Sequence, residues 1–409
     1  MYVVKESDIM LIAFKFKNYK CFYEENILDL SATLEKRHSG ELINVNGNKL
    51  LPVIAIHGAN ASGKSTILDA IKYMLETVRY SFYGDTEKNL VTFPFAFSNK
   101  TKKENSEFEI SINLGDSEYR YGFSLNKNCI SEEWLYVGKF ELGTKSKEKK
   151  IFEREGKCVT FAKKYNNDKS IWELFSSGLN VDKMLTLSIL GIKEESGILR
   201  DIYTWMTNID TKIDTSFESN VSITVLNNNK KLDKAFNTMI NEIDPCLKGI
   251  FINKEKKEEE ELYQIFGIHN NIDENNEEFR IPLSQESDGT IKAFNILPSV
   301  LLSLEKGSLL CIDELDTRLH PLLFKKIVNM YKDKSINKHN AQLIFTSHST
   351  FMLNNKDMRR DEIYLVEKNK LAQSKLYSLS LFRDVRVDTD YEKKYLSGAF
   401  GAIPFSEEE

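Results

Sequence analysis

The segment from residue 51 to residue 66 constrains the fold of this chain more than any other part of it. A short apolar run, Leu51–His57, leads into a glycine-rich turn, and apolar residues then recur at helical spacing from Ile67 to Val78. The turn reads Gly58-Ala59-Asn60-Ala61-Ser62-Gly63-Lys64-Ser65-Thr66. A strand, a glycine turn and a helix in this order are what a chain needs to present backbone N–H groups to an anion.

The glycine-rich turn matches GxxxxGK[ST] at every fixed position, which predicts a phosphate loop. Its glycines allow the backbone N–H groups of residues 58–66 to converge on phosphate oxygens. Lys64 is then expected to reach the β- and γ-phosphates of ATP, and the Ser65 hydroxyl to ligate Mg²⁺. The competing interpretation is a chance match in an ordinary turn, and the flanking strand and helix argue against it.

A second apolar run, Leu309–Ile312, ends in the acidic pair Asp313-Glu314. Two carboxylates after a buried strand cost desolvation free energy unless a cation or hydrogen-bond donors lie nearby. We expect Asp313 to hold Mg²⁺ through its water shell and Glu314 to polarise an attacking water molecule. Surface acids after a strand are common, so the pairing with the phosphate loop carries this interpretation.

Three further residues are predicted to reach a nucleotide. His348 follows the apolar strand Gln342–Ser347, and the carboxyl ends of parallel strands gather at one edge of a sheet. It would contact the γ-phosphate or orient the water; the simpler alternative is a structural histidine. Ser287 and Gly289 directly precede the helical run Ile291–Leu304, at the position of an anion-binding helix start, although a plain N-cap serine gives the same pattern.

The α/β pattern falls into two parts. Residues 10–136 contain the phosphate loop and alternating, strand-like segments, and residues 281–409 contain the acidic pair and His348. Residues 137–280 are rich in charge and predict a largely helical insertion, which forms a lid or a projecting arm. We therefore expect an α/β P-loop ATPase head with a mixed β-sheet, interrupted by this insertion. Residues 1–9 are expected to be a poorly ordered, dispensable leader.

Composition limits the classes of function. A length of 409 residues fits two domains, and a net charge of −5 argues against a protein that coats nucleic acid, although a local basic face is compatible with it. Five scattered cysteines without metal-ligand spacing are typical of a reduced, cytoplasmic protein. Every apolar stretch is far shorter than a membrane span, so we expect no membrane association.

The order of these motifs resembles the ABC-type ATPases, with Walker A at 58–66, a signature at Ser287-Asp288-Gly289-Thr290, Walker B at Asp313-Glu314 and a switch histidine at His348. The runs DELDTRLHP (313–321) and FKNYKCF (16–22) resemble the AAA family branch with OLD-type and RecF-type ATPases. Lesser motifs resemble the abortive-infection ATPases of the RloA/AbiLi group: Pro94–Phe97, Tyr119–Phe123, Trp134–Tyr136 and Tyr395–Pro404. The signature lacks the double glycine and the glutamine of transporter subunits, and Phe93–Phe97 stand where a lid glutamine is expected.

This resemblance implies an ATPase with ATP and Mg²⁺ as cofactors that works as a homodimer or higher oligomer. In such dimers the Ser287 and Gly289 of one copy clamp the γ-phosphate held by the Walker A, Asp313, Glu314 and His348 of the other. It also implies the sensor of an anti-phage system with a separately encoded, nuclease-like effector, since the roughly 60 residues after His348 are too few for a nuclease domain. DNA or a phage component is a further partner that this resemblance implies, and the sequence does not identify the trigger. The alternatives are a DNA-repair or chromosome-handling ATPase and a non-catalytic, ATP-dependent scaffold.

Overall fold

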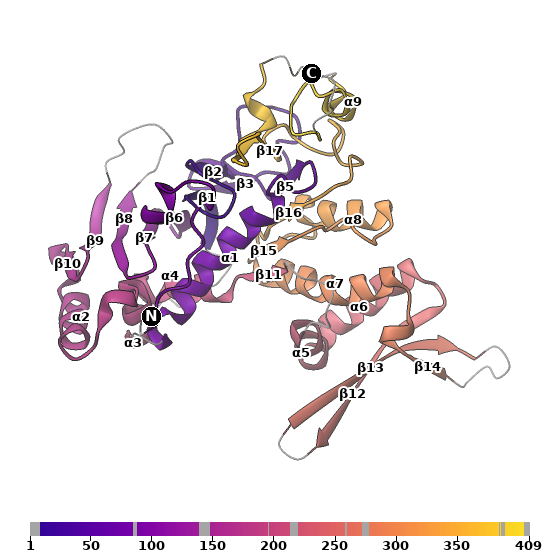
Figure 1. Ribbon diagram of the computed structural model, residues 1–409. Coiled ribbons are helices and arrows are strands. Elements are labelled where there is room, and N and C mark those ends of the chain that lie inside the picture. The colour runs from indigo at the N-terminus through magenta and orange to yellow at the C-terminus, as the bar shows by residue number, and fades with distance from the viewer. Residues whose placement is uncertain are drawn as a thin grey trace.

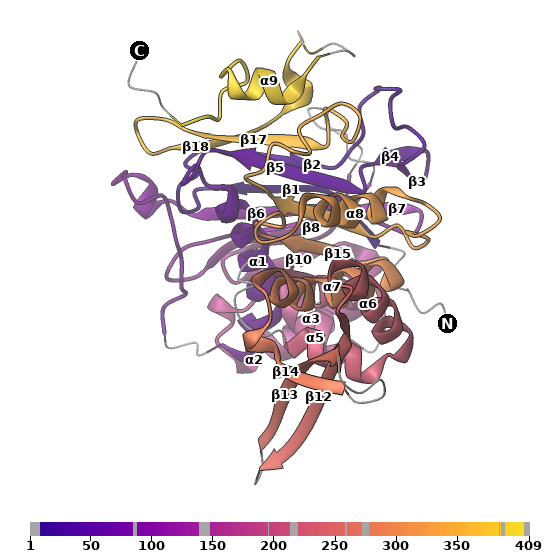
Figure 2. The ribbon, with the colours of Figure 1, turned by 90° about the vertical axis from the view of Figure 1, so that its right-hand side faces the viewer.

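The computed structural model describes residues 9–84, 88–138, 148–194, 196–212, 220–257, 260–271, 278–383, 385 and 389–404. Within these ranges two large sheets form the body of the molecule, and a third, smaller sheet projects away from it (Figures 1 and 2). Of the leader predicted at residues 1–9, all but Ile9 lies outside the described residues, and Ile9 opens the first strand.

The central sheet has six strands in the order β11-β15-β16-β5-β17-β18, of which all but the antiparallel edge strand β18 run parallel. Alternate residues of each strand face two different cores: Leu309 and Cys311 pack with α1, whereas Leu310 and Ile312 pack with α7 and α8. Burial on both faces explains why these strands are continuous apolar runs in the sequence. The strands are β5 (Val53–Gly58), β11 (Asp210–Lys212), β15 (Leu309–Ile312), β16 (Gln342–Thr346), β17 (Ile363–Lys368) and β18 (Ser374–Ser378).

Three helices cover the central sheet. The helix α1 (Lys64–Tyr80) packs on one face, between the central sheet and the second large sheet, and α7 (Asp288–Lys306) and α8 (Pro321–Lys332) pack on the other (Figure 1). Ser287 caps α7 by accepting a hydrogen bond from the backbone N–H of Thr290, at 3.1 Å. The helices predicted after the phosphate loop and before β15 are therefore both present.

The second large sheet is antiparallel, in the order β10-β9-β8-β7-β6-β1-β2. A tight hairpin turn at Gly115-Asp116 joins β6 to β7, with Gly115 in the left-handed region at φ 58°. This sheet continues to residue 161, beyond the boundary expected at residue 136. Its strands are β1 (Ile9–Lys17), β2 (Asn26–Asp29), β6 (Ser106–Leu114), β7 (Ser117–Leu125), β8 (Ile130–Gly138), β9 (Lys149–Glu155) and β10 (Cys158–Phe161), and β3 (Ile43–Val45) pairs with β4 (Asn48–Leu50) beside it.

The segment 137–280 contains helices, as predicted, and strands as well. Its helices are α2 (Asn166–Gly178), α3 (Thr186–Lys193), α4 (Ile198–Asn208), α5 (Asn220–Asn228) and α6 (Lys230–Ile243). The strands β9 and β10 extend the antiparallel sheet, and β11 joins the central sheet beside β15. The projecting sheet consists of β12 (Leu247–Lys257), β13 (Glu260–Asn270) and β14 (Glu278–Pro282). The insertion is therefore built into both large sheets and carries an arm made of strands (Figure 2).

The remaining elements are short. The helix α9 (Tyr391–Leu396) lies near the C-terminus, and its side-chain cap is Asp390, which accepts a hydrogen bond from the backbone N–H of Lys393 at 3.0 Å. Short 3₁₀ helices occur at Ser81–Tyr83, Thr101–Lys103, Lys163–Tyr165, Val181–Lys183, Leu283–Gln285 and Leu379–Leu381. In the part of the chain that the structure describes, no helix is long and apolar enough to cross a membrane.

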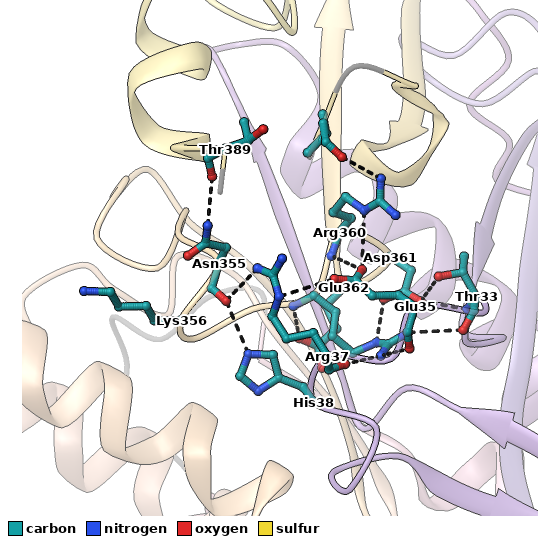
Figure 3. Close-up of polar contacts among 12 residues, drawn as sticks. Thr33, Glu35, Arg37, His38, Asn355, Lys356, Arg360, Asp361, Glu362 and Thr389 are labelled. Carbon is teal, nitrogen blue, oxygen red and sulfur yellow. Dashed lines mark hydrogen bonds and ion pairs between the residues drawn. The ribbon is translucent and has the colours of Figure 1, made fainter. Parts of the chain in front are cut away.

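A buried polar network fixes the loop that runs from β16 to β17 (Figure 3). Arg359 is fully buried; its Nε and Nη2 donate to the two carboxylate oxygens of Asp361, at 2.8 and 2.7 Å. Its Nη1 donates to the carbonyl oxygen of Glu35 at 2.9 Å, so the network ties this loop to the N-terminal part of the chain. Lys332 and Glu362, both buried, form an ion pair at 2.8 Å beside it.

Candidate functional site

The phosphate loop needs glycine at two positions where the backbone is crowded or left-handed. A Cβ atom on Gly58 would lie 2.4 Å from the carbonyl oxygen of Val366 on the neighbouring strand β17. Gly63 has φ 115°, and its Cβ would lie 2.9 Å from the Sγ of Cys21. Gly63 is the N-cap of α1, and the first N–H groups of a helix have no partner within that helix. The loop therefore presents backbone donors at the positive end of a helix dipole.

Lys64 lies across the loop with its side chain buried. The Nζ donates to the carbonyl oxygens of Gly58 and Ala59, at 2.8 and 3.0 Å, and the residue is only 4% exposed. Burial lowers the pKa of Lys64, and the carboxylates of Asp313 and Glu314 oppose this shift. The ammonium of Lys64 is thus held against the loop that would bind phosphate, and the acidic pair lies close enough to influence its pKa.

The acidic pair lies at the same sheet edge as the phosphate loop, because β15, β16 and β5 are parallel neighbours. Asp313 is 7% exposed and accepts a hydrogen bond from the hydroxyl of Thr346. The backbone N–H of Glu314 donates to the same hydroxyl at 2.8 Å, and Glu314 has φ 48°, in the left-handed region. The Oε1 of Glu314 lies 3.5 Å from the Nε2 of His348. The side chain of Glu314 is 47% exposed, and that of His348 37%.

Residues from both motifs line one cavity of about 970 Å³. The predicted residues in its lining are Asn60, Ala61, Gly63, Lys64, Ser65, Thr66, Glu314 and His348, together with Thr317, Lys20, Cys21 and Lys368. Ser287 and Gly289 are not among the described residues that line this cavity. The described lining also lacks four other predicted residues, which lie at the ends of the neighbouring strands or within the loop: Gly58, Ala59, Ser62 and Asp313. The structure thus brings the Walker A loop, Glu314 and His348 together and leaves the signature outside.

The donors at this edge fit a magnesium ion bound together with a nucleotide. Ser65 is exposed and lines the cavity, and Asp313 directly follows the end of β15. Mg²⁺ prefers oxygen ligands, keeps several waters and is held by one or two protein groups plus phosphates. Among the residues described, no group of three or more His, Cys, Asp or Glu side chains could hold a metal by itself. With a nucleotide bound, its phosphates and water would supply the rest of the coordination.

Several residues that shape this site were not predicted. The carboxylate of Asp316 accepts hydrogen bonds from the backbone N–H groups of His348, at 3.2 Å, and Ser349, at 2.9 Å, and so fixes the loop that carries the histidine. The backbone N–H of Ala59 donates to the carbonyl oxygen of Ala402 at 2.9 Å, so the C-terminal tail supports the phosphate loop. In the sequence, the tail was indicated only by the motif Tyr395–Pro404, which resembles abortive-infection ATPases. Backbone contacts between residues so far apart leave no pattern in a sequence.

The histidine next to the phosphate loop predicts a pH dependence of stability. Burial, with the nearby charges of Lys64 and His348, lowers the pKa of His57 to about 3. The unfolded chain takes up this proton near pH 6.5, so unfolding binds about one proton between these values. The free energy of unfolding should therefore fall as the pH drops below about 6.5, by about 1.4 kcal/mol per pH unit from this group.

Urea unfolding between pH 7 and pH 4 measures this slope. In His57→Gln the slope of the free energy of unfolding against pH should correspond to about one proton fewer bound on unfolding. The same change at the exposed His339 should leave the slope as in the wild type. An unchanged slope in His57→Gln would show that His57 does not carry the effect.

In the central parallel sheet, β5 leads into the phosphate loop, and the acidic pair follows β15, which is separated from β5 by β16. This arrangement is the core of a P-loop ATPase head of the ABC type. The chain belongs to the family described as "AAA domain, putative AbiEii toxin, Type IV TA system", whose model matches residues 53–182 and 207–354, more than half of the chain. The prediction of an ABC-type AAA family ATPase is thereby confirmed. The unmatched residues 183–206 lie within the predicted insertion.

One similar solved structure is a crystal structure of the SMC head bound to the C-winged helix domain of ScpA. The two sequences are 13% identical, and the alignment covers 90% of this chain and 97% of the other, with a TM-score of 0.47. A comparison with curated proteins found no match.

Proposed function

We propose that this protein binds and hydrolyses ATP, with Mg²⁺, between two copies that meet head to tail. The observation that carries this proposal is the composition of the cavity: it holds the Walker A loop, Glu314 and His348 of one chain, while Ser287, at the exposed start of α7, is outside it. A nucleotide bound only by the residues of this cavity would leave its γ-phosphate partly solvated. A second copy could cover that phosphate with the start of its own α7.

In the proposed site each residue has a separate task. The N–H groups at the start of α1 and the ammonium of Lys64 bind the phosphates, and Glu314 takes a proton from the water that attacks the γ-phosphate. His348, which lies 3.5 Å from Glu314, orients that water or contacts the γ-phosphate. Ser65 and Asp313 would hold Mg²⁺, which neutralises phosphate charge when it is bound. Ser287 and Gly289 of the partner copy complete the site.

We further propose that the ATPase is the sensor of a cytoplasmic anti-phage system and acts on a separately encoded, nuclease-like effector. Two observations support this role: the description of the family names a toxin of a type IV TA system, and the lesser motifs resemble abortive-infection ATPases. Co-purification with a nuclease-like protein encoded by the neighbouring gene would support it. Salt-sensitive, ATP-dependent binding of duplex DNA by this chain alone would instead favour a role in DNA repair.

The dimer is tested with a variant that binds ATP and does not cleave it. Glu314→Gln should lower kcat by about 100-fold or more, because it removes the general base, and should therefore accumulate as an ATP-bound dimer. Light scattering after gel filtration, with Mg-ATP and with Mg-ADP, measures the mass. The exposed Glu173 provides the matched control, since Glu173→Gln should behave as the wild type does.

A second change shows whether the signature forms the interface. Ser287→Arg, added to Glu314→Gln, should abolish the dimer while Mg-ATP still binds to the monomer, because the bulky side chain stands at the start of α7. A Glu314→Gln protein that binds Mg-ATP and stays monomeric at every concentration tested would contradict the head-to-tail proposal.

A further inference from the structure

Lys292 is a buried lysine that links the signature helix to the catalytic turn of the same chain. It lies on α7, five residues after Ser287, and only 6% of it is exposed. Its Nζ donates to the backbone carbonyl oxygen of Glu314 at 3.1 Å. A buried ammonium is costly unless negative charges compensate it, and the carboxylates of Glu314, Asp316 and Asp313 counter the burial that lowers the pKa of Lys292.

The peptide groups of Glu314 are held from two sides. The backbone N–H of Glu314 donates to the hydroxyl of Thr346 on β16, and its carbonyl oxygen accepts from Lys292 and from the backbone N–H of Thr317, at 3.2 Å. Glu314 and Arg318, at φ 48° and 64°, are both left-handed, a conformation that a residue with a Cβ atom keeps only where its surroundings enforce it. The turn that carries the proposed general base therefore depends on contacts from outside it.

The start of α7 touches the other end of the same turn. A Cβ atom on Gly289 would lie 3.1 Å from the carbonyl oxygen of Arg318, so the signature glycine packs directly on the turn. Along a helix the rise is about 1.5 Å per residue, which places Lys292 about 7.5 Å from Ser287 on one rigid element. A shift of the helix start would thus be transmitted to the backbone of Glu314 at two points, Gly289 and Lys292.

We propose that Lys292 is a positioning residue that couples the two ATP sites of the dimer, an inference that rests on the proposed function. ATP held by the partner contacts Ser287 and Gly289 at the start of α7. Lys292 carries the resulting position of α7 to the carbonyl of Glu314 in its own chain. The Glu314 carboxylate then reaches its place over this chain's own ATP only when the partner site is loaded. Hydrolysis in the two sites is cooperative for this reason.

Lys292→Met tests the coupling, since methionine has a similar length and neither charge nor N–H donors. We expect kcat to fall by about 100-fold, because a displacement of about 1 Å can cost this much. The Kd for Mg-ATP should stay within about twofold, since Lys292 lies outside the cavity lining. The Hill coefficient for hydrolysis should fall from about 2 in the wild type to about 1. A residue that merely stabilises the fold would change neither the Hill coefficient nor kcat at constant Kd.

Three variants complete the experiment. Lys292→Arg keeps a buried cationic donor and should restore most of the turnover and cooperativity. Lys292→Leu, which also lacks a charge and a donor, should behave like methionine and replaces it if methionine lowers the yield of folded protein. Lys306→Met, at the exposed far end of α7, should have the turnover and cooperativity of the wild type.

Wild-type kcat and cooperativity in folded Lys292→Met would overturn the coupling and leave the proposed ATPase intact. Loss of folding in both neutral variants would assign Lys292 to stability alone and would also overturn it. A wild-type protein that neither binds nor cleaves Mg-ATP would instead refute the proposed function itself.

Discussion

Replacing Lys64 with alanine is expected to weaken Mg-ATP binding by about 100-fold or more and to abolish measurable hydrolysis. Each hydrogen bond between an ammonium and a charged oxygen contributes about 1.5–3 kcal/mol, and Lys64 is positioned to make two of them to the β- and γ-phosphates. In the structure two of its three N–H donors bind the carbonyl oxygens of Gly58 and Ala59. These contacts show that the ammonium already lies against the loop, so little reorganisation is needed when a phosphate replaces them.

Isothermal titration calorimetry with Mg-ATP and a phosphate-release assay measure the two effects of Lys64→Ala. The matched control is Lys72→Ala, on a more exposed part of the same helix, where Lys72 pairs with Glu76 at 3.8 Å. This surface pair contributes at most about 1 kcal/mol to stability, and the control should bind ATP as the wild type does. An equal loss of ATP affinity and hydrolysis in both variants would mean that Lys64 stabilises α1 and does not bind the nucleotide.

Replacing Arg359 with leucine is expected to lower the free energy of unfolding by about 3–5 kcal/mol, the usual cost of removing one partner from a buried ion pair. The change leaves the carboxylate of Asp361, which is 3% exposed, without its bidentate partner. It also removes the donors to the carbonyl oxygens of Glu35 and Arg37. A loss of this size is a large share of the 5–15 kcal/mol by which proteins are stable.

Urea unfolding followed by circular dichroism measures the effect of Arg359→Leu, with Arg383→Leu as the control because Arg383 is exposed. The control should change stability by no more than about 0.5 kcal/mol. Since the network anchors the loop that begins at His348, the leucine variant should also lose hydrolysis before it loses ATP binding as urea is added. A free energy of unfolding within 1 kcal/mol of the wild type would show that solvent or neighbouring groups compensate for Asp361.

The parts of the fold that the sequence predicted are those specified by local patterns. β5, β15 and β16 are buried on both faces and therefore appear as uninterrupted apolar runs, and each is followed by its functional residues. Because parallel strands end at a common edge, finding Gly58–Thr66, Asp313-Glu314 and His348 after three such runs was enough to place them together. The helix after Ser287 could also be predicted, from the helical spacing of its apolar residues and from its N-cap serine.

The parts that were not predicted depend on contacts between distant residues. β11 has three residues, too few to show a period, and it becomes a strand only by pairing with β15, about 100 positions later. The charged residues Lys254–Lys257 and Glu260-Glu261 have no apolar alternation, yet they belong to the paired strands β12 and β13. Lys292 was part of an apolar helix in the sequence, and only the packing of α7 on the turn after β15 shows why a lysine stands there.

The central claim is that residues 58–66 and the pair Asp313-Glu314 bind one metal-bound triphosphate. Titrating the wild-type protein with ATP in a calorimeter, once with excess Mg²⁺ and once with EDTA, tests this most directly. We predict saturable binding with one ATP per chain and an affinity that falls by tenfold or more when Mg²⁺ is removed. Equal affinity under both conditions, or no binding in either, would contradict the claim.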